Sequence, residues 1–151
     1  MNASDAVPYR AVVPYLNIKG GKDALAFYRD AFAAEEVVSF DREGGVLAHA
    51  ELRIGEATFM VREEYPEYGY LSPQTTGGAP INLLVYVPDT RTFTERAVAA
   101  GATLVRPIQM QFHGDLMSEI RDPFGYSWFV ATRITAMAPA EIRNAAESAK
   151  L

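Results

Sequence analysis

Two histidine–carboxylate pairs are the residues of this sequence whose types and spacing best suit chemistry. His49 and Glu51 stand two positions apart in VLAHAELRI, a stretch with the composition of a β-strand, so alternation places both side chains on one face. An imidazole beside a carboxylate could bind a metal ion or move a proton. His113 and Asp115 could join them in space. Two ligands on one strand are too few for a metal site, and a polar pair on a sheet surface is the alternative interpretation.

Other kinds of site are excluded by composition. The chain has no cysteine, which removes disulfides, thiolate nucleophiles and cysteine-bound metals. Lys19-Gly20-Gly21-Lys22 lacks the spacing of a phosphate-binding loop. The formal net charge is −5, with lysine and arginine scattered, which argues against nucleic acid or an anionic membrane as a partner. No apolar run approaches the ~20 residues of a membrane span. A cytoplasmic protein is therefore expected.

The elements that must position these residues repeat along the 151-residue chain. The first half predicts a strand, an amphipathic helix and three strands, at residues 11–18, 22–33, 36–41, 46–53 and 57–62. The second half predicts the same order at residues 81–87, 92–100, 103–107, 117–121 and 126–132, with an extended stretch and loop at 108–115. Neither half can close a core alone, so the two modules are expected to form one domain.

The predicted organisation has three parts. Residues 1–10 form an N-terminal arm, residues 11–134 the single domain, and residues 135–151 a helical tail. Within the domain, module one covers 11–63, a loop covers 64–79 and module two covers 80–134. The loop is rich in proline, glycine and tyrosine, and its length makes it a candidate functional loop. A connection whose tyrosines pack for stability is the alternative.

Several short motifs together resemble a known family. They are Val13-Pro14-Tyr15-Leu16, Ala26-Phe27-Tyr28, His49-Ala50-Glu51-Leu52 and the turn and strand Asp122-Pro123-Phe124-Gly125-Tyr126-Ser127-Trp128. With the two modules, they resemble the vicinal oxygen chelate superfamily, which includes glyoxalase I, extradiol dioxygenases and bleomycin-resistance proteins, and within it the PhnB-like branch. The resemblance covers residues 10–134. It implies an α+β fold in which two βαβββ modules form a cupped mixed β-sheet with flanking helices.

The resemblance also implies where a metal would be bound. The family's metal enzymes place four His, Gln or Glu ligands on the first and last strands of the modules, and these positions correspond here to Val13, Met60, Asn82 and Phe129. Such side chains cannot hold a divalent ion, which needs carboxylate or imidazole ligands. We therefore expect no metal and no cofactor, with His49, Glu51 and His113 as fallback ligands.

An apolar cleft is the expected alternative to the metal site. If this chain forms the cupped sheet of the family, the alternation of side chains along each strand places seven of them on the wall of its cleft. They are Val13, Tyr15, Thr58, Met60, Asn82, Ser127 and Phe129. An aromatic and methionine-lined cleft suits a flat organic molecule. The alternative is that these side chains fill the core. Trp128 alternates away from the cleft and is expected in the core.

The drug-sequestering members of the family bind in clefts at a dimer interface, so the resemblance implies a homodimer. We expect it to bind a small apolar or aromatic molecule without metal, as in drug or toxin sequestration. Three alternatives stay open. The protein could be a metal-dependent lyase or dioxygenase with non-standard ligands, or a metal-free enzyme that polarises its substrate through Asn82 or Tyr15. It could also be a ligandless scaffold for a protein partner. The sequence leaves open whether any reaction is catalysed.

Overall fold

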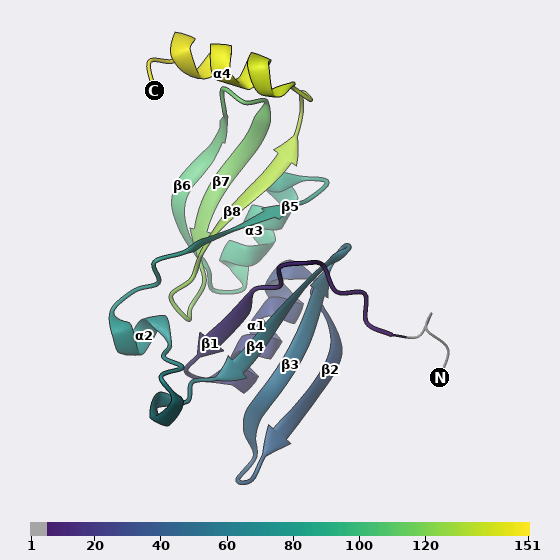
Figure 1. Ribbon diagram of the computed structural model, residues 1–151, viewed down its shortest axis with the longest axis vertical. Coiled ribbons are helices and arrows are strands. Elements are labelled where there is room, and N and C mark those ends of the chain that lie inside the picture. Colours follow the sequence, from purple (N-terminus) through teal and green to yellow (C-terminus); the bar gives the residue numbers. More distant parts are fainter. Residues whose placement is uncertain (1–5) are drawn as a thin grey trace.

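The computed structural model describes residues 6–151 and contains the two predicted modules (Figure 1). The first consists of β1 (Tyr15–Ile18), α1 (Gly21–Phe32), β2 (Glu35–Arg42), β3 (Val46–Ile54) and β4 (Ala57–Glu63). The second consists of β5 (Asn82–Tyr86), α3 (Thr90–Ala99), β6 (Thr103–Met110), β7 (Asp115–Arg121) and β8 (Ser127–Arg133). The α+β class and the βαβββ modules are confirmed. Residues 1–5 of the predicted arm lie outside the described residues.

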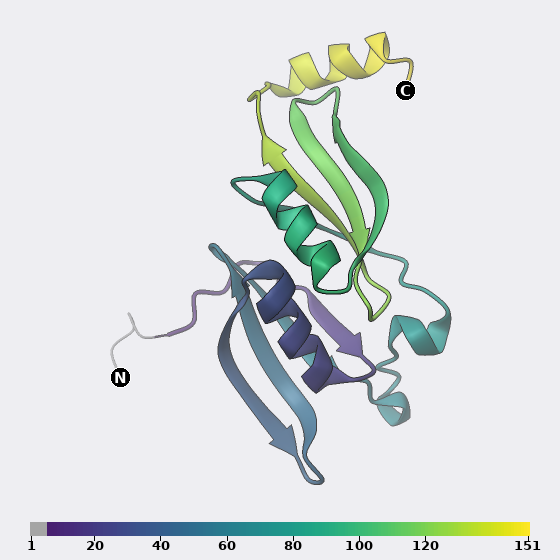
Figure 2. The ribbon, with the colours of Figure 1, turned by 180° about the vertical axis from the view of Figure 1, so that it is seen from behind.

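The strands form two four-stranded mixed sheets, in the orders β1-β4-β3-β2 and β5-β8-β7-β6. In each sheet the first strand of the module runs parallel to the last, and the remaining pairs are antiparallel. The helix of each module covers one face of its sheet, and α1 packs against α3 (Figure 2). We call the sheet face opposite the helix the open face. Both open faces lie on the same side of the molecule, towards the viewer in Figure 1.

Aromatic side chains join the two modules. Tyr28 and Phe32 of α1 are buried and pack against Trp128 of β8, with ring centroids 5.8 and 4.9 Å apart. Trp128, 4% exposed, therefore belongs to the core, as its alternation predicts. Arg96 of α3 donates a 2.6 Å hydrogen bond to the carbonyl oxygen of Asp30 at the end of α1. The modules thus share one core, which buries the apolar face that each would otherwise expose.

Two strands differ from their predicted ranges next to a proline. The strand expected at residues 11–18 begins only at Tyr15, because Pro14 has no N–H for the ladder, although its carbonyl oxygen accepts from the Met60 amide at 2.8 Å. In the second module, β6 continues through Pro107 to Met110, so the extended stretch expected from residue 108 is the end of this strand. A proline is tolerated there because β6 is an edge strand, whose outer side needs no partner.

The loop and the tail contain short helices. Residues 64–79 hold a 3-10 helix, η2 (Pro66–Tyr68), and α2 (Pro73–Thr76), which lies against the Asp122–Gly125 turn. A Cβ atom on Gly125 would come within 2.7 Å of the Pro73 Cβ, so glycine is required for this contact. The tail forms α4 (Pro139–Ser148), with no buried residue, near the end of the second sheet (Figure 1). No helix in residues 6–151 is long and apolar enough to cross a bilayer.

Candidate functional site

The open face of the first sheet carries four of the seven predicted wall residues. Tyr15 of β1 lies opposite Met60 of β4, and Met60 lies opposite Glu51 of β3, so the three side chains form a row across the sheet. Thr58 lies two positions before Met60 on the same face. Val13, just before β1, is half-buried. Thr58 is buried, whereas Tyr15 is 39% exposed.

A chain of polar contacts runs along this face and contains the predicted His49–Glu51 pair. The Tyr9 hydroxyl donates to Glu51 Oε1 at 2.7 Å, and the same oxygen lies 3.2 Å from His49 Nε2. At the other end, His49 Nδ1 lies 2.6 Å from the Tyr15 hydroxyl. Burial raises the pKa of Tyr15, so its hydroxyl keeps its proton at neutral pH. The arrangement is a tyrosine–imidazole–carboxylate relay that begins and ends at two residues of the row, Tyr15 and Glu51, on either side of Met60.

The Arg62 guanidinium borders this relay. It lies over the rings of Tyr15 and Tyr70, 4.3 and 3.6 Å from their centroids, and its Nε donates to Asn17 Oδ1 at 2.8 Å. Cation–π contacts of this kind favour a fixed side-chain position. Tyr70 belongs to the 64–79 loop, so one of the loop's tyrosines contacts the edge of the open face.

The second sheet holds the other three predicted residues. Asn82 of β5 lies opposite Ser127 of β8, and both line a cleft of about 550 Å³ between this sheet, α2 and the Asp122–Gly125 turn. Glu119 also lines the cleft, and its Oε1 accepts from the Ser127 hydroxyl at 3.2 Å. Phe129 lies opposite Glu119 and is half-buried. Of the seven predicted residues only Thr58 is buried, so the set lines open faces rather than filling the core.

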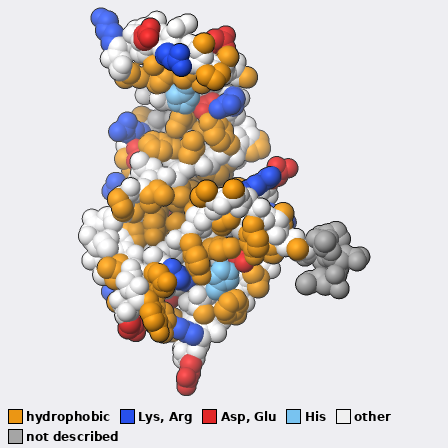
Figure 3. Space-filling view, in the orientation of Figure 1, with side chains coloured by type: hydrophobic (Ala, Val, Ile, Leu, Met, Phe, Trp, Pro, Cys, Tyr) orange, Lys and Arg blue, Asp and Glu red, His pale blue; other side chains and the backbone are white. Residues whose placement is uncertain are grey.

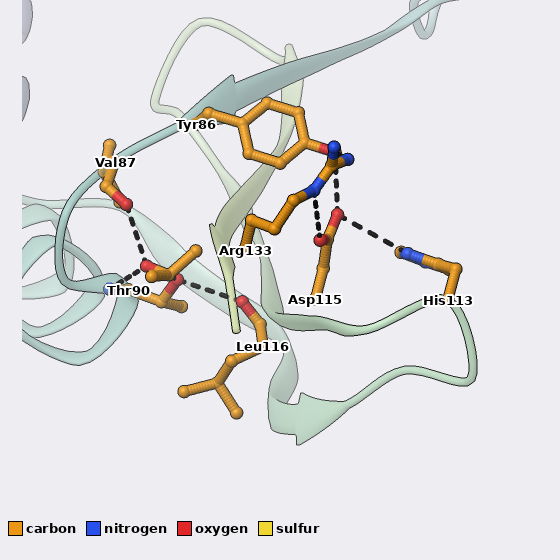
Figure 4. Close-up of polar contacts among 8 residues, drawn as sticks. Tyr86, Val87, Thr90, His113, Asp115, Leu116 and Arg133 are labelled. Carbon is orange, nitrogen blue, oxygen red and sulfur yellow. Dashed lines mark hydrogen bonds and ion pairs between the residues drawn. The ribbon is translucent and has the colours of Figure 1, made fainter. Parts of the chain in front are cut away.

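A second polar cluster lies at the far end of this sheet (Figure 4). The buried Asp115 accepts from the Tyr86 hydroxyl at 2.7 Å and from Arg133 Nε at 3.2 Å, and His113 Nδ1 lies 3.4 Å from Asp115 Oδ2. Burial alone would raise the pKa of Asp115, but the hydrogen bonds and charges of Tyr86, Arg133 and His113 outweigh it and lower the pKa. His113 thus belongs to a cluster on the second module and does not complete a site with His49 and Glu51.

The residues do not fit a divalent metal site. The four positions that correspond to the family's ligands hold Val13, Met60, Asn82 and Phe129, without an imidazole or a carboxylate among them. Across residues 6–151, no three His, Asp or Glu side chains gather closely enough to hold a metal ion. We therefore derive no chemistry through a metal.

Comparison with known proteins places this geometry in a family. The sequence profile described as "Glyoxalase/Bleomycin resistance protein/Dioxygenase superfamily" matches residues 12–130. The chain belongs to this superfamily. An uncharacterized protein of Mycobacterium bovis is 32% identical over 141 residues, which cover 91% of this chain and 93% of that protein. An uncharacterized protein of Mycobacterium tuberculosis has the same identity over 83% of its length.

Several solved structures have the same fold as this chain. TioX from Micromonospora sp. ML1 superposes with a TM-score of 0.65 at 25% identity, over 85% of this chain and all of that one. The fosfomycin resistance protein FosX from Listeria monocytogenes gives 0.61 at 14% identity, over 89% of this chain and 98% of that one. A glyoxalase-related enzyme from Fulvimarina pelagi gives 0.63 at 22% identity, over 83% of this chain and 88% of that one. Resistance proteins and enzymes thus share this scaffold, and the site decides between activities.

Sequence reasoning did not find three residues of the candidate site. Tyr9 lies in the N-terminal arm and Arg62 reads as an ordinary strand residue. Glu119 lies in the predicted strand 117–121 with no local sign of burial, whereas it is only 8% exposed. Alternation along β7 places Glu119 on the open face, but the cleft above it depends on α2, more than forty residues earlier in the chain. No local sequence pattern records that contact.

Proposed function

We propose that the protein binds a small apolar or aromatic molecule on its open faces without a metal ion. The observation that carries this proposal is the replacement of the four metal-ligand positions by Val13, Met60, Asn82 and Phe129 on faces that stay accessible. Exposed apolar side chains continue from them, with Tyr15 39% and Leu84 51% exposed. Hydrophobic side chains gather over both sheets in Figure 3. Exposed apolar patches of this kind often mark sites where a protein binds a ligand or a partner.

The proposal extends to the assembly and the role. We propose a homodimer in which the open faces of two copies form the walls of the binding clefts. In one copy, each sheet is covered by a helix on one face only, and a second copy could cover the other face. For a PhnB-like member of the superfamily, we propose sequestration of a drug or toxin in the cytoplasm as the specific role, because it needs binding and no catalytic group. Retention of a ligand between two apolar walls would suffice for it.

A metal-free enzyme is the second candidate, and the Tyr15–His49 contact favours it. A hydroxyl 2.6 Å from an imidazole, with a carboxylate on the other ring nitrogen, is an arrangement that can transfer a proton to a bound molecule. Substitution Tyr15→Phe separates the two candidates. It would abolish turnover and retain binding if the relay is catalytic, and it would change binding alone if the protein only sequesters its ligand.

The binding proposal is tested by calorimetric titration with a panel of flat aromatic molecules. Met60→Lys places a charge in the middle of the row on the first sheet and is expected to lower the affinity at least tenfold, since a buried charge opposes an apolar ligand. Val98→Lys makes the same change on the helix side, where Val98 is 40% exposed, and is expected to leave binding unchanged. Equal affinities for Met60→Lys and wild type would overturn the placement of the site.

A further inference from the structure

Glu51 is a buried carboxyl group with an unused acceptor. The residue is 5% exposed, and its Oε1 is contacted by Tyr9 and His49. Its Oε2 is buried and accepts no hydrogen bond from any described residue. Leaving a buried charged acceptor unpaired destabilises a fold by more than an ordinary hydrogen bond contributes. The Oε2 atom is therefore free to accept a donor that a ligand brings to the open face.

Thr58 places a second unused polar atom next to the first. Its Oγ1 is also buried and has no hydrogen-bond partner in residues 6–151. Thr58 pairs with Arg53, and Glu51 pairs with Met60, so Thr58 and Glu51 are diagonal neighbours across β3 and β4 on the open face. Diagonal neighbours of this kind lie within about 7–8 Å of each other, close enough for one ligand group to reach both.

Tyr9 occupies the other oxygen of this carboxyl group, Glu51 Oε1, through contacts that are easily lost. Its side chain comes from the arm that passes the β3–β4 end of the first sheet (Figure 1), and the residue is 53% exposed. Besides the Tyr9–Glu51 hydrogen bond, the arm is held by the Arg10–Glu56 ion pair, which is exposed on both sides. Exposed ion pairs contribute little. The Tyr9 phenol is therefore an aromatic hydrogen-bond donor that a ligand of similar chemistry could replace.

We propose that Glu51 and Thr58 form a recognition subsite for the protonated amine of an aromatic ligand, and that Tyr9 covers the subsite until the amine displaces its hydroxyl. This inference rests on the proposed binding function. An ammonium group has three donors, enough for both oxygens of Glu51 and the hydroxyl of Thr58, and its charge complements the carboxylate. The ring of the same ligand would lie against Tyr15 and Met60, which continue the row from Glu51.

The test uses two probes that differ only in the donor group, naphthylmethylamine and naphthylmethanol, titrated by calorimetry at neutral pH. We expect wild type to bind the amine about tenfold or more tightly than the alcohol, as a charge-assisted hydrogen bond provides. Glu51→Gln is expected to remove this preference. Tyr9→Phe, which loses the covering hydroxyl, is expected to bind the amine a few-fold more tightly. Glu43→Gln, the matched loss of one exposed charge in the β2–β3 turn, is expected to behave as wild type.

The outcomes separate this inference from the function on which it rests. An unchanged preference in Glu51→Gln, with both probes bound, would overturn the subsite and leave the binding proposal intact. Weaker amine binding by Tyr9→Phe would overturn the covering role of Tyr9. Binding of neither probe by wild type would overturn the binding proposal and this inference together. If Glu51→Gln does not fold, Thr58→Val takes its place, since it removes an unpaired hydroxyl, and a full amine preference in that variant would overturn the subsite.

Discussion

The Tyr28 hydroxyl donates a 2.6 Å hydrogen bond to Asp122 Oδ2 and thereby joins α1 of the first module to the β7–β8 turn of the second. Trp128 Nε1 donates to the same oxygen at 2.9 Å, while Oδ1 accepts from the backbone amides of Phe124 and Tyr126 at 2.9 and 3.0 Å. One buried carboxyl group thus receives four donors. It shapes its own turn through the two backbone amides, and through Tyr28 it also fixes the modules to each other.

Substitution Tyr28→Phe tests this junction. It removes one donor from a buried acceptor without emptying the space that the ring fills, and we expect a loss of about 1–3 kcal/mol in the free energy of unfolding. Urea denaturation followed by circular dichroism measures it. Tyr68→Phe, at a residue that is 70% exposed, is the matched control and is expected to stay within about 0.5 kcal/mol of wild type. Equal effects of the two substitutions would mean that the junction contributes nothing specific.

The stability of this junction should depend on pH with a defined sign. Burial raises the pKa of Asp122 above its usual 3.8, although its four hydrogen bonds oppose the shift. The folded protein then holds this proton more tightly than the unfolded chain does, so the group's contribution is greatest below pH 3.8 and is lost as the pH rises through the raised value. The stability of wild type relative to Asp122→Asn, from urea denaturation at several pH values, is expected to fall as the pH rises above 3.8 and through the raised pKa.

Asp115 provides the comparison of opposite sign. Burial would raise its pKa, but Tyr86, Arg133 and His113 lower it below 3.8, so its contribution is present above that pH and is lost as the pH falls through the lowered value. The stability of wild type relative to Asp115→Asn should therefore decrease in acid. The same slope for both aspartates would contradict the environments described here.

The parts of the fold that were predictable from the sequence are those recorded in local patterns. The stripe of Leu25, Tyr28 and Phe32 predicts α1 to within a residue at each end, because a 3.6-residue period has one structural meaning. The helix α2 was missed, since four residues, Pro73–Thr76, are too few for a period. It begins with Ser72 as its N-cap and Pro73 at its first position, a signal that was present within a segment interpreted as loop.

The site was predictable only in its sheet alternation. Period two placed Tyr15 and Met60 on one face, and the register confirms that they are neighbours. The same rule could not show that Tyr9 reaches Glu51, because 42 positions separate them and the arm has no regular structure. Nor could it show how far His113 lies from His49, since the distance between residues of different modules depends on how whole modules pack.

Removal of divalent metal should leave the protein unchanged. With Val13, Met60, Asn82 and Phe129 at the ligand positions, we expect the same melting temperature before and after chelation and on addition of Zn²⁺, Ni²⁺ or Mn²⁺. A metal ion that binds the folded protein, at a free concentration one hundred times its Kd, would raise the free energy of unfolding by about 2.7 kcal/mol. The melting temperature of a chain of this size would rise by roughly 5–10 °C. A saturable rise in melting temperature of that order, or a stoichiometric ion in the purified protein, would favour the metal-dependent enzyme instead. His49→Ala and Glu51→Ala would then show whether the relay residues bind it.

The proposed homodimer predicts an association that a single charge can break. Val38 and Phe40 on the first open face are 40% and 56% exposed, and Leu84 on the second is 51% exposed. Apolar side chains in such numbers favour association, because burying them in an interface removes them from water. We expect sedimentation of wild type at micromolar concentration to give twice the chain mass of 16.6 kDa. Leu84→Asp is expected to shift the protein towards 16.6 kDa, since the partner would have to bury an unpaired carboxylate.

The control for this prediction is Val98→Asp, which adds the same charge on the exposed side of α3 and is expected to stay dimeric. Far-ultraviolet circular dichroism would show that Leu84→Asp keeps its fold. Aromatic ligand binding should weaken together with dimerisation in Leu84→Asp, because each cleft would lose the wall that the second copy provides. A monomeric wild type that still binds an aromatic ligand would place the whole site within one copy. The open face around Tyr15 and Met60 would then have to suffice for binding.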